Sequence, residues 1–175
     1  MNLLRSFILI TAAQVPLLHR GKKRLRFSST RRSSGSRRSV RTDGRAFAPL
    51  PAMWLDGALH FSTGLDEQKG RNLLRNPNCI LTTGNNSYRQ GLDVVVEGRA
   101  ERVTDRPTLE RLAELWQSKI GWPWDVAKDG FRPRPEGPQP ENADTVAVVP
   151  VFAVRPSRIL SFGRGERFTQ TRYRL

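Results

Sequence analysis

The stretch FSTGLDEQKGRNLLRNPNCILTTG, residues 61–84, predicts a strand, a short helix and a second strand in direct succession. The first strand ends in the sequence Ser-Thr-Gly at residues 62–64, and the short helix carries Lys69 and Arg71. Asn76-Pro77 ends the helix, because the residue before a proline disfavours helical backbone angles. Hydroxyls, free backbone N–H groups and two cations therefore meet where a helix begins, which suits a phosphate.

Length and charge describe a single domain with a basic N-terminus. The 175 residues suffice for one domain with a hydrophobic core. The net charge is +14, but residues 1–45 contain twelve Lys or Arg and one acid, which leaves eighteen bases and fifteen acids in residues 46–175. The near-neutral body is therefore not a nucleic-acid-binding surface by composition.

The N-terminal residues read as an extension. Residues 3–18 are largely apolar but shorter than the ~20 residues of a spanning helix. The positive charge follows this run, whereas a signal peptide carries it in front, so we expect a cytoplasmic protein. Residues 27–38 are rich in Ser and Arg and predict disorder. We therefore predict a basic, low-complexity extension at 1–38, either an anchor to RNA or anionic lipid or a plain solvated segment, and a folded domain at 39–175.

Single titratable residues suggest no catalytic set. The one cysteine, Cys79, excludes an internal disulfide and a cysteine-based metal site, and its apolar strand predicts a buried, inert thiol. His60 stands in a strand beside Phe61, which favours a structural histidine over a catalytic base. No Ser-His-Asp set, HExxH motif or P-loop is present. We expect no metal site and assign no catalytic residue.

Hairpins and one long strand make up most of the body. Asp43-Gly44 and Asp56-Gly57 each predict a type I′ turn, because both turn residues need positive φ. Pro49 and Pro51 cannot donate ladder hydrogen bonds, so their strand segment should lie at an edge or be bulged. Residues 92–103 alternate between apolar and charged, as in a half-buried strand. The predicted inward face contains Val94, Val96, Gly98 and Ala100.

One helix and a final set of strands complete the chain. Asp105 can cap a helix that reaches Ile120 and ends at Gly121. Residues 122–142 read as a proline-rich loop, whose Trp122 and Trp124 either wall a substrate pocket or pack over the barrel. Strands follow at 145–162 and 168–175. The pattern predicts a mainly β fold, an antiparallel β-barrel with one long and one short helix.

In order and spacing, these pieces resemble the pyridoxamine 5′-phosphate oxidase-like family, the FMN-binding split barrels, and especially its flavin- and deazaflavin-dependent oxidoreductases. The resemblance covers roughly residues 39–175. It rests on TDGRAFAPLPAMWLDGALHFST, QKGRNLLRNP, LDVVVEGRAERVTD and FGRGERFTQTRYRL. It implies a homodimer of split barrels with two cofactor sites at the subunit interface.

The resemblance also implies a set of cofactor-binding residues. Lys69 keeps the family's phosphate cation, and Gln68 stands where the family has an arginine. The other positions that match are Leu50, Pro51, Ser62, Thr63, Asp93, Phe162 and Arg172. Among these, Leu50-Pro51 falls where backbone groups meet the ring, Asp93 replaces a glutamine near the ring, and Phe162 replaces a tryptophan ten residues before an arginine.

Departures from the family pattern bear on the substrate. The Arg-x-His pair that holds the substrate phosphate in the oxidase is replaced by residues 168–170, Phe-Thr-Gln. We therefore expect FMN, or else the deazaflavin coenzyme or haem, and a small organic substrate other than pyridoxamine phosphate. A non-catalytic carrier of flavin or haem is the alternative. The family's apolar first strand shrinks to Ser39-Val40, so we expect either that residues 23–28 supply a poor substitute or that the barrel lacks part of a strand.

Overall fold

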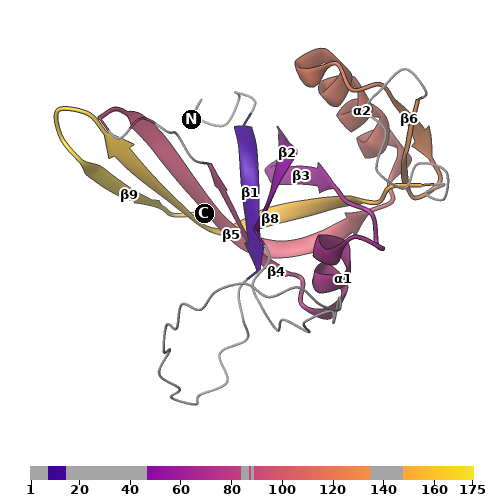
Figure 1. Cartoon of the computed structure of the whole chain (residues 1–175), viewed down its shortest axis with the longest axis horizontal. Helices are drawn as coiled ribbons and strands as arrows, with labels where there is room; N and C mark the ends of the chain where they lie inside the picture. The colour runs from indigo at the N-terminus through magenta and orange to yellow at the C-terminus, as the bar shows by residue number, and fades with distance from the viewer. Residues whose placement is uncertain (1–7, 15–46, 84–86, 88, 135–147) are drawn as a thin grey trace, which may run out of the picture.

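The computed structural model describes residues 8–14, 47–83, 87, 89–134 and 148–175. Antiparallel strands dominate these residues, and two helices accompany them (Figure 1). The strands are β1 (Ile8–Gln14), β2 (Phe47–Leu55), β3 (Ala58–Ser62), β4 (Asn78–Thr83), β5 (Gly91–Val103), β6 (Trp124–Ala127), β7 (Gly130–Pro133), β8 (Val151–Arg164) and β9 (Thr169–Tyr173). The helices are α1 (Gln68–Arg75) and α2 (Arg106–Ile120).

The main sheet returns on itself. Its strand order is β3-β2-β1-β4-β5-β8-β9, and β3 also pairs with β8. Residues 151–154 of β8 pair with both β3 and β5, whereas residues 159–163 pair with β5 and β9. The chain is therefore a split barrel, which confirms the predicted fold class. We call the projecting part, residues 91–96 of β5, 159–164 of β8, and β9, the β-arm; Figure 1 shows it pointing away from α2 and β6.

Two hydrophobic cores hold the barrel and its helical cap. The first core lies among the barrel strands and α1, and Phe61 of β3 stacks on Phe152 of β8 within it, with ring centroids 5.7 Å apart. The second core joins α2 to β2, β7 and β8. Its buried members are Met53, Val103, Leu109, Leu112, Trp116, Phe131 and Val151. The first core follows from the predicted apolar face of β5, because Val94, Val96 and Ala100 are buried in it.

The N-terminal expectation needs correction at residues 8–14. We predicted an extension outside the barrel and a first strand that is either incomplete or supplied by residues 23–28, but Ile8–Gln14 forms β1, which pairs with both β2 and β4. A short apolar run fits a strand buried inside a sheet as well as it fits a leader segment. Its partners lie far away in the sequence, so its own composition could not reveal the pairing. The rest of the predicted extension, and the Asp43-Gly44 turn, lie outside the described residues.

The second predicted hairpin is present. Asp56 and Gly57 connect β2 to β3 with φ values of 48° and 77°, the positive angles that a type I′ turn requires. Residues 49–51 pair with β1, and the described pairing of β2 with β3 begins only at Met53. The segment with the two prolines is thus open on the β3 side, which confirms the prediction of an edge and leaves a gap beside the end of β3.

The long helix and the segment after it cover one end of the barrel. Asp105 accepts a hydrogen bond from the Thr108 N–H at 2.9 Å, and Gly121 ends α2 in the left-handed conformation, as predicted. The following segment was predicted as a loop, but it contains the hairpin β6–β7. The prolines that flank this hairpin led to the prediction of a loop. Two backbone hydrogen bonds between Phe131 and Val149 join β7 to the segment before β8. No helix among the described residues is long and apolar enough to cross a membrane.

Candidate functional site

A cavity of about 220 Å³ lies where the open segment of β2, the end of β3, the start of α1 and the segment before β6 meet. It opens beside the gap that the two prolines leave in the sheet. The residues that line it are Pro49, Leu50, Pro51, Ser62, Thr63, Glu67, Lys69, Trp122, Trp124 and Val149. The cavity thus joins an apolar floor, two hydroxyls, one cation, one carboxylate and two indoles.

Two glycines fix α1 against the end of β3. A Cβ built on Gly70 would lie 2.0 Å from the carbonyl oxygen of Gly64, so only glycine permits this contact. The N–H of Glu67 donates to the same carbonyl at 3.3 Å, and the N–H of Thr63 donates to Pro150 O at 3.2 Å. These contacts bring the first turn of α1 next to the Ser-Thr-Gly end of the strand, as the sequence predicted.

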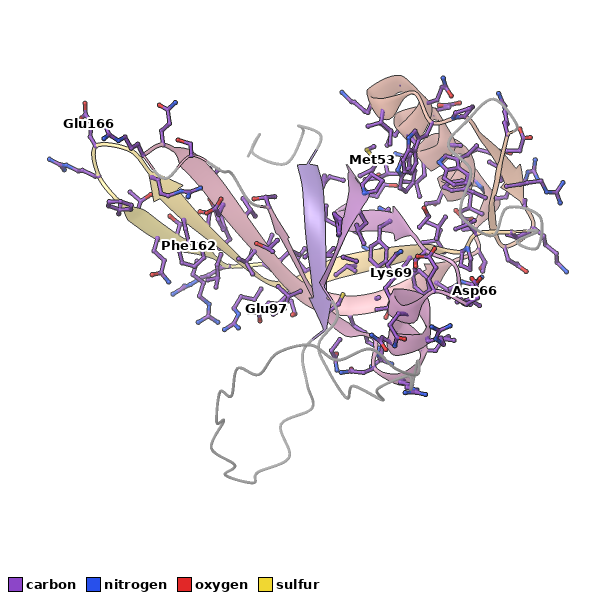
Figure 2. The ribbon with its side chains drawn as sticks, viewed as in Figure 1. Met53, Asp66, Lys69, Glu97, Phe162 and Glu166 are labelled. Atoms are coloured by element: carbon purple, nitrogen blue, oxygen red, sulfur yellow. The ribbon has the colours of Figure 1, made fainter. Side chains whose placement is uncertain are left out.

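Lys69 supplies the cation of the cavity wall. Its side chain is 28% exposed, and burial lowers the pKa of its ammonium group below the usual value. Its Nζ is paired with Oε2 of Glu67. The other carboxylate oxygen of Glu67, Oε1, accepts a hydrogen bond from the Gly64 N–H at 2.9 Å. In Figure 2, Lys69 lies on the side of the barrel near α1.

The indole rings of Trp122 and Trp124 also line the cavity. Trp122 and Trp124 meet edge to face, with ring centroids 6.0 Å apart and an interplanar angle of 68°. Trp124 also stacks on Phe131 of β7 at 5.7 Å and 25°. The two tryptophans therefore line the cavity and also pack over the barrel, which confirms the predicted packing, while their contact with a substrate stays a prediction. The Trp124 Nε1 atom is buried and has no hydrogen-bond partner among the described residues.

Five of the nine predicted cofactor-binding residues meet at this cavity. They are Leu50, Pro51, Ser62, Thr63 and Lys69. Gln68 does not join them, because its exposed side chain donates to Asn72 Oδ1 at 2.7 Å instead. Gln68 and Lys69 are consecutive residues of α1, so their side chains project from different sides of the helix.

The remaining three predicted residues lie on the β-arm. Asp93 of β5 and Phe162 of β8 are register partners, and Arg172 of β9 pairs with Leu160. Asp93 also forms a salt bridge with Arg164 at 2.9 Å. Figure 2 shows Phe162 on the β-arm, away from Lys69, which lies nearer the middle of the molecule. A single chain therefore does not bring these residues to the cavity.

The sequence reasoning missed Glu67, Pro49 and Val149 as wall residues. Pro49 belongs to the proline pair that already marked an open strand segment. Glu67 stands directly before α1, a position that normally suggests helix capping, yet its side chain turns back to Gly64. Val149 reaches the cavity through its bridge to Phe131, which no local sequence signal announces.

Two titratable residues lie apart from the cavity. Cys79 is 2% exposed, and burial raises its pKa to about 12, which confirms the predicted buried thiol. His60 is 4% exposed, and burial lowers its pKa, as expected of a structural histidine. Across the described part of the chain, no group of three or more His, Cys, Asp or Glu side chains could hold a metal ion.

Comparison with known families identifies the fold. The family described as pyridoxamine 5′-phosphate oxidase matches residues 30–151, which is more than half of the chain. The chain belongs to this family. No curated protein sequence matches the chain. The matched range of the pyridoxamine 5′-phosphate oxidase family includes the predicted residues of the cavity wall.

Solved structures share the same fold at low sequence identity. An F420 reductase has a TM-score of 0.51 and 18% identity, over 90% of this chain and 93% of its own. General stress protein 26 from Bacillus anthracis has a TM-score of 0.56 and 14% identity, over 99% and 94%. A haem-binding protein from Mycobacterium smegmatis has a TM-score of 0.55 and 12% identity, over 96% and 53%. These likenesses concern the fold alone.

Proposed function

We propose that the protein is a cytoplasmic, homodimeric oxidoreductase that binds FMN or the deazaflavin coenzyme. It would pass a hydride to or from a small organic molecule. Membership of the pyridoxamine 5′-phosphate oxidase family supports this proposal. The observation that carries it is the meeting, around one cavity, of five residues that the family resemblance implies.

The wall chemistry fits a cofactor of this type. Lys69 can neutralise part of a phosphate charge, and the hydroxyls of Ser62 and Thr63 can donate hydrogen bonds to its oxygens. Leu50 and Pro51 offer an apolar surface and backbone groups to a flat ring. A bound flavin or deazaflavin supplies the hydride chemistry, while the protein binds and orients it and excludes water.

The size of the cavity supports a shared site. About 220 Å³ is below the ~300–1,000 Å³ of pockets that bury a drug-sized ligand. We propose that the β-arm of a second copy, with Asp93, Phe162 and Arg172, completes the cavity in a homodimer. An isologous dimer forms two such sites, because each arm contacts the cavity of the other copy.

A titration tests the cofactor class. The full chain is titrated with FMN and, separately, with the deazaflavin coenzyme, and binding is followed by cofactor fluorescence. Saturable binding of either compound supports the proposal and identifies the cofactor class, which narrows the search to the redox partners of that cofactor. A folded dimer that binds neither compound would contradict the proposed function.

A non-catalytic carrier of flavin or haem is the second candidate. The described titratable side chains in the cavity wall are Lys69 and Glu67, and because they pair with each other, neither stands as a free proton donor or acceptor for catalysis. The reduced cofactor is therefore mixed with candidate acceptors, such as quinones, in the presence and absence of the protein. If the protein never accelerates reoxidation of the cofactor, the carrier function is favoured.

A further inference from the structure

The cavity wall contains an anion of the protein itself at the place proposed for a cofactor phosphate. Two of the donors at the end of β3 and the start of α1 are the Gly64 N–H and the Lys69 ammonium group. Glu67 engages both of them, with Oε1 accepting from Gly64 N at 2.9 Å and Oε2 paired with Lys69 Nζ. A phosphate that binds here must therefore compete with the Glu67 carboxylate for these two donors.

Local geometry holds Glu67 in this position. Glu67 is the N-cap residue of α1 with extended backbone angles, and its side chain makes no capping bond to its own helix. It turns back three residues to the backbone of Gly64, where the absent side chain leaves room for it: a Cβ there would lie 3.3 Å from Glu67 Oε1, a tight contact. The carboxylate is part of the cavity wall and its side chain is 39% exposed, so ligands can reach it.

The pair changes what the wall can accept. Lys69 and Glu67 together carry no net charge, so the wall does not offer the uncompensated cation that a phosphomonoester needs. Such a group carries close to two negative charges at neutral pH. It would have to displace Glu67 from both donors or lie beside a like charge, and either costs binding free energy. A phosphodiester carries a single charge, and a hydroxyl carries none.

We propose that Glu67 is a specificity-determining residue that selects against a terminal phosphomonoester. The inference rests on the proposed function and deepens it: the cavity favours a cofactor of the flavin type whose chain carries a phosphodiester or a hydroxyl at this place. FMN would then bind little better than its dephosphorylated form.

Riboflavin and FMN test this directly, because they differ only by the phosphomonoester. Each is titrated into the wild-type chain, Glu67→Gln, and the control Glu114→Gln, which removes an exposed carboxylate of α2 outside the cavity wall. We expect Glu67→Gln to raise the affinity for FMN by about tenfold, the scale of one charge-assisted hydrogen bond set free at a half-exposed site. Riboflavin affinity should change by less than about twofold, since its hydroxyl carries no charge for Glu67 to repel. An FMN-to-riboflavin ratio that is the same in all three proteins overturns the inference.

Inorganic phosphate provides a second measurement that needs no flavin. Phosphate is titrated into the ¹⁵N-labelled wild type and Glu67→Gln, and the amide resonance of Gly64 reports occupancy. If neither protein binds a flavin or the deazaflavin coenzyme, the proposed function fails, but tighter binding of phosphate by Glu67→Gln still supports the role of Glu67. Equal phosphate affinity in the two proteins overturns that role.

Discussion

Gly64 and Gly70 lie in direct backbone contact. The contact is so close that a Cβ on Gly70 would lie 2.0 Å from the Gly64 carbonyl oxygen. This contact holds the first turn of α1 against the end of β3. The position of Lys69 relative to Ser62 and Thr63 depends on it, so the contact can be tested through stability and through cofactor binding.

Gly70→Ala is expected to lower the free energy of unfolding by about 1–3 kcal/mol, the usual cost of overpacking a close contact. Urea denaturation measures this change. Arg75→Ala, an exposed residue in the last turn of α1, is the matched control and should change the free energy by less than about 0.5 kcal/mol. A Gly70→Ala protein as stable as the wild type would show that α1 can shift without cost.

Lys69→Ala is expected to weaken cofactor binding by about 1.5–3 kcal/mol, the scale of a charge-assisted hydrogen bond. Fluorescence titration with the cofactor that the wild type binds measures the loss. Arg71→Ala serves as the control, because its exposed guanidinium bonds to Asp66 O and Gln68 and does not line the cavity. Unchanged affinity in Lys69→Ala would remove this residue from the site.

Mixing two defective variants tests the shared site. Lys69→Ala alters the cavity, and Arg172→Ala alters the β-arm. In a heterodimer of the two, one site carries both changes and the other carries neither. Random reassociation of an equal mixture should therefore restore about one quarter of the wild-type cofactor sites.

The control for this experiment is a mixture of Lys69→Ala with Gly70→Ala, two changes on the same side of the interface. No heterodimer of that pair contains an intact site. If the Lys69→Ala and Arg172→Ala mixture also recovers nothing although subunits exchange, the β-arm does not complete the partner's cavity.

We expect burial of His60 to make the stability of the fold sensitive to acid. Burial lowers its pKa in the folded state below the ordinary value of 6.5, so the unfolded chain binds its proton first as the pH falls. Stability is therefore expected to decline from about pH 6.5 downwards, relative to a variant without this group. Urea denaturation at pH 7.5 and pH 5.5 should show a smaller difference for His60→Gln than for the wild type. An equal difference would assign the acid sensitivity to other groups.

We expect the thiol of Cys79 to be unreactive in the native protein. With its pKa raised to about 12 and its side chain 2% exposed, it forms almost no thiolate at neutral pH. The native protein should not react with a chromogenic disulfide reagent over minutes, and full reaction should follow in urea. Rapid reaction of the native protein would show that the strand β4 opens readily.

Local signals predicted part of this molecule well. Asp56-Gly57, the cap at Asp105 and the alternation along β5 depend on backbone angles and burial of neighbouring residues, and each is present. The place of β1 depends on partners more than thirty residues away, and composition could not reveal it. The same holds for β6–β7, whose prolines suggested a loop.

The candidate site divides in the same way. Ser62, Thr63 and Lys69 were predictable because they lie within one short stretch that folds locally. The orientation of Glu67 was not, because it depends on the missing side chain of Gly64. The register pairing of Asp93 with Phe162 was not predictable either, because it joins two strands that lie far apart in the sequence.

The single strand β8, which has one register shift against β5 at Ser157, sets the distance between the barrel and the β-arm. Val151 sits at the seam of the barrel and Phe162 on the β-arm, eleven positions further along one strand. At ~3.3 Å per residue they are separated by at most about 36 Å. One inserted residue would lengthen this span by about 3.3 Å and turn every later side chain to the opposite face of the sheet. Relatives with a shared site should thus tolerate substitutions along β8 far better than changes in its length.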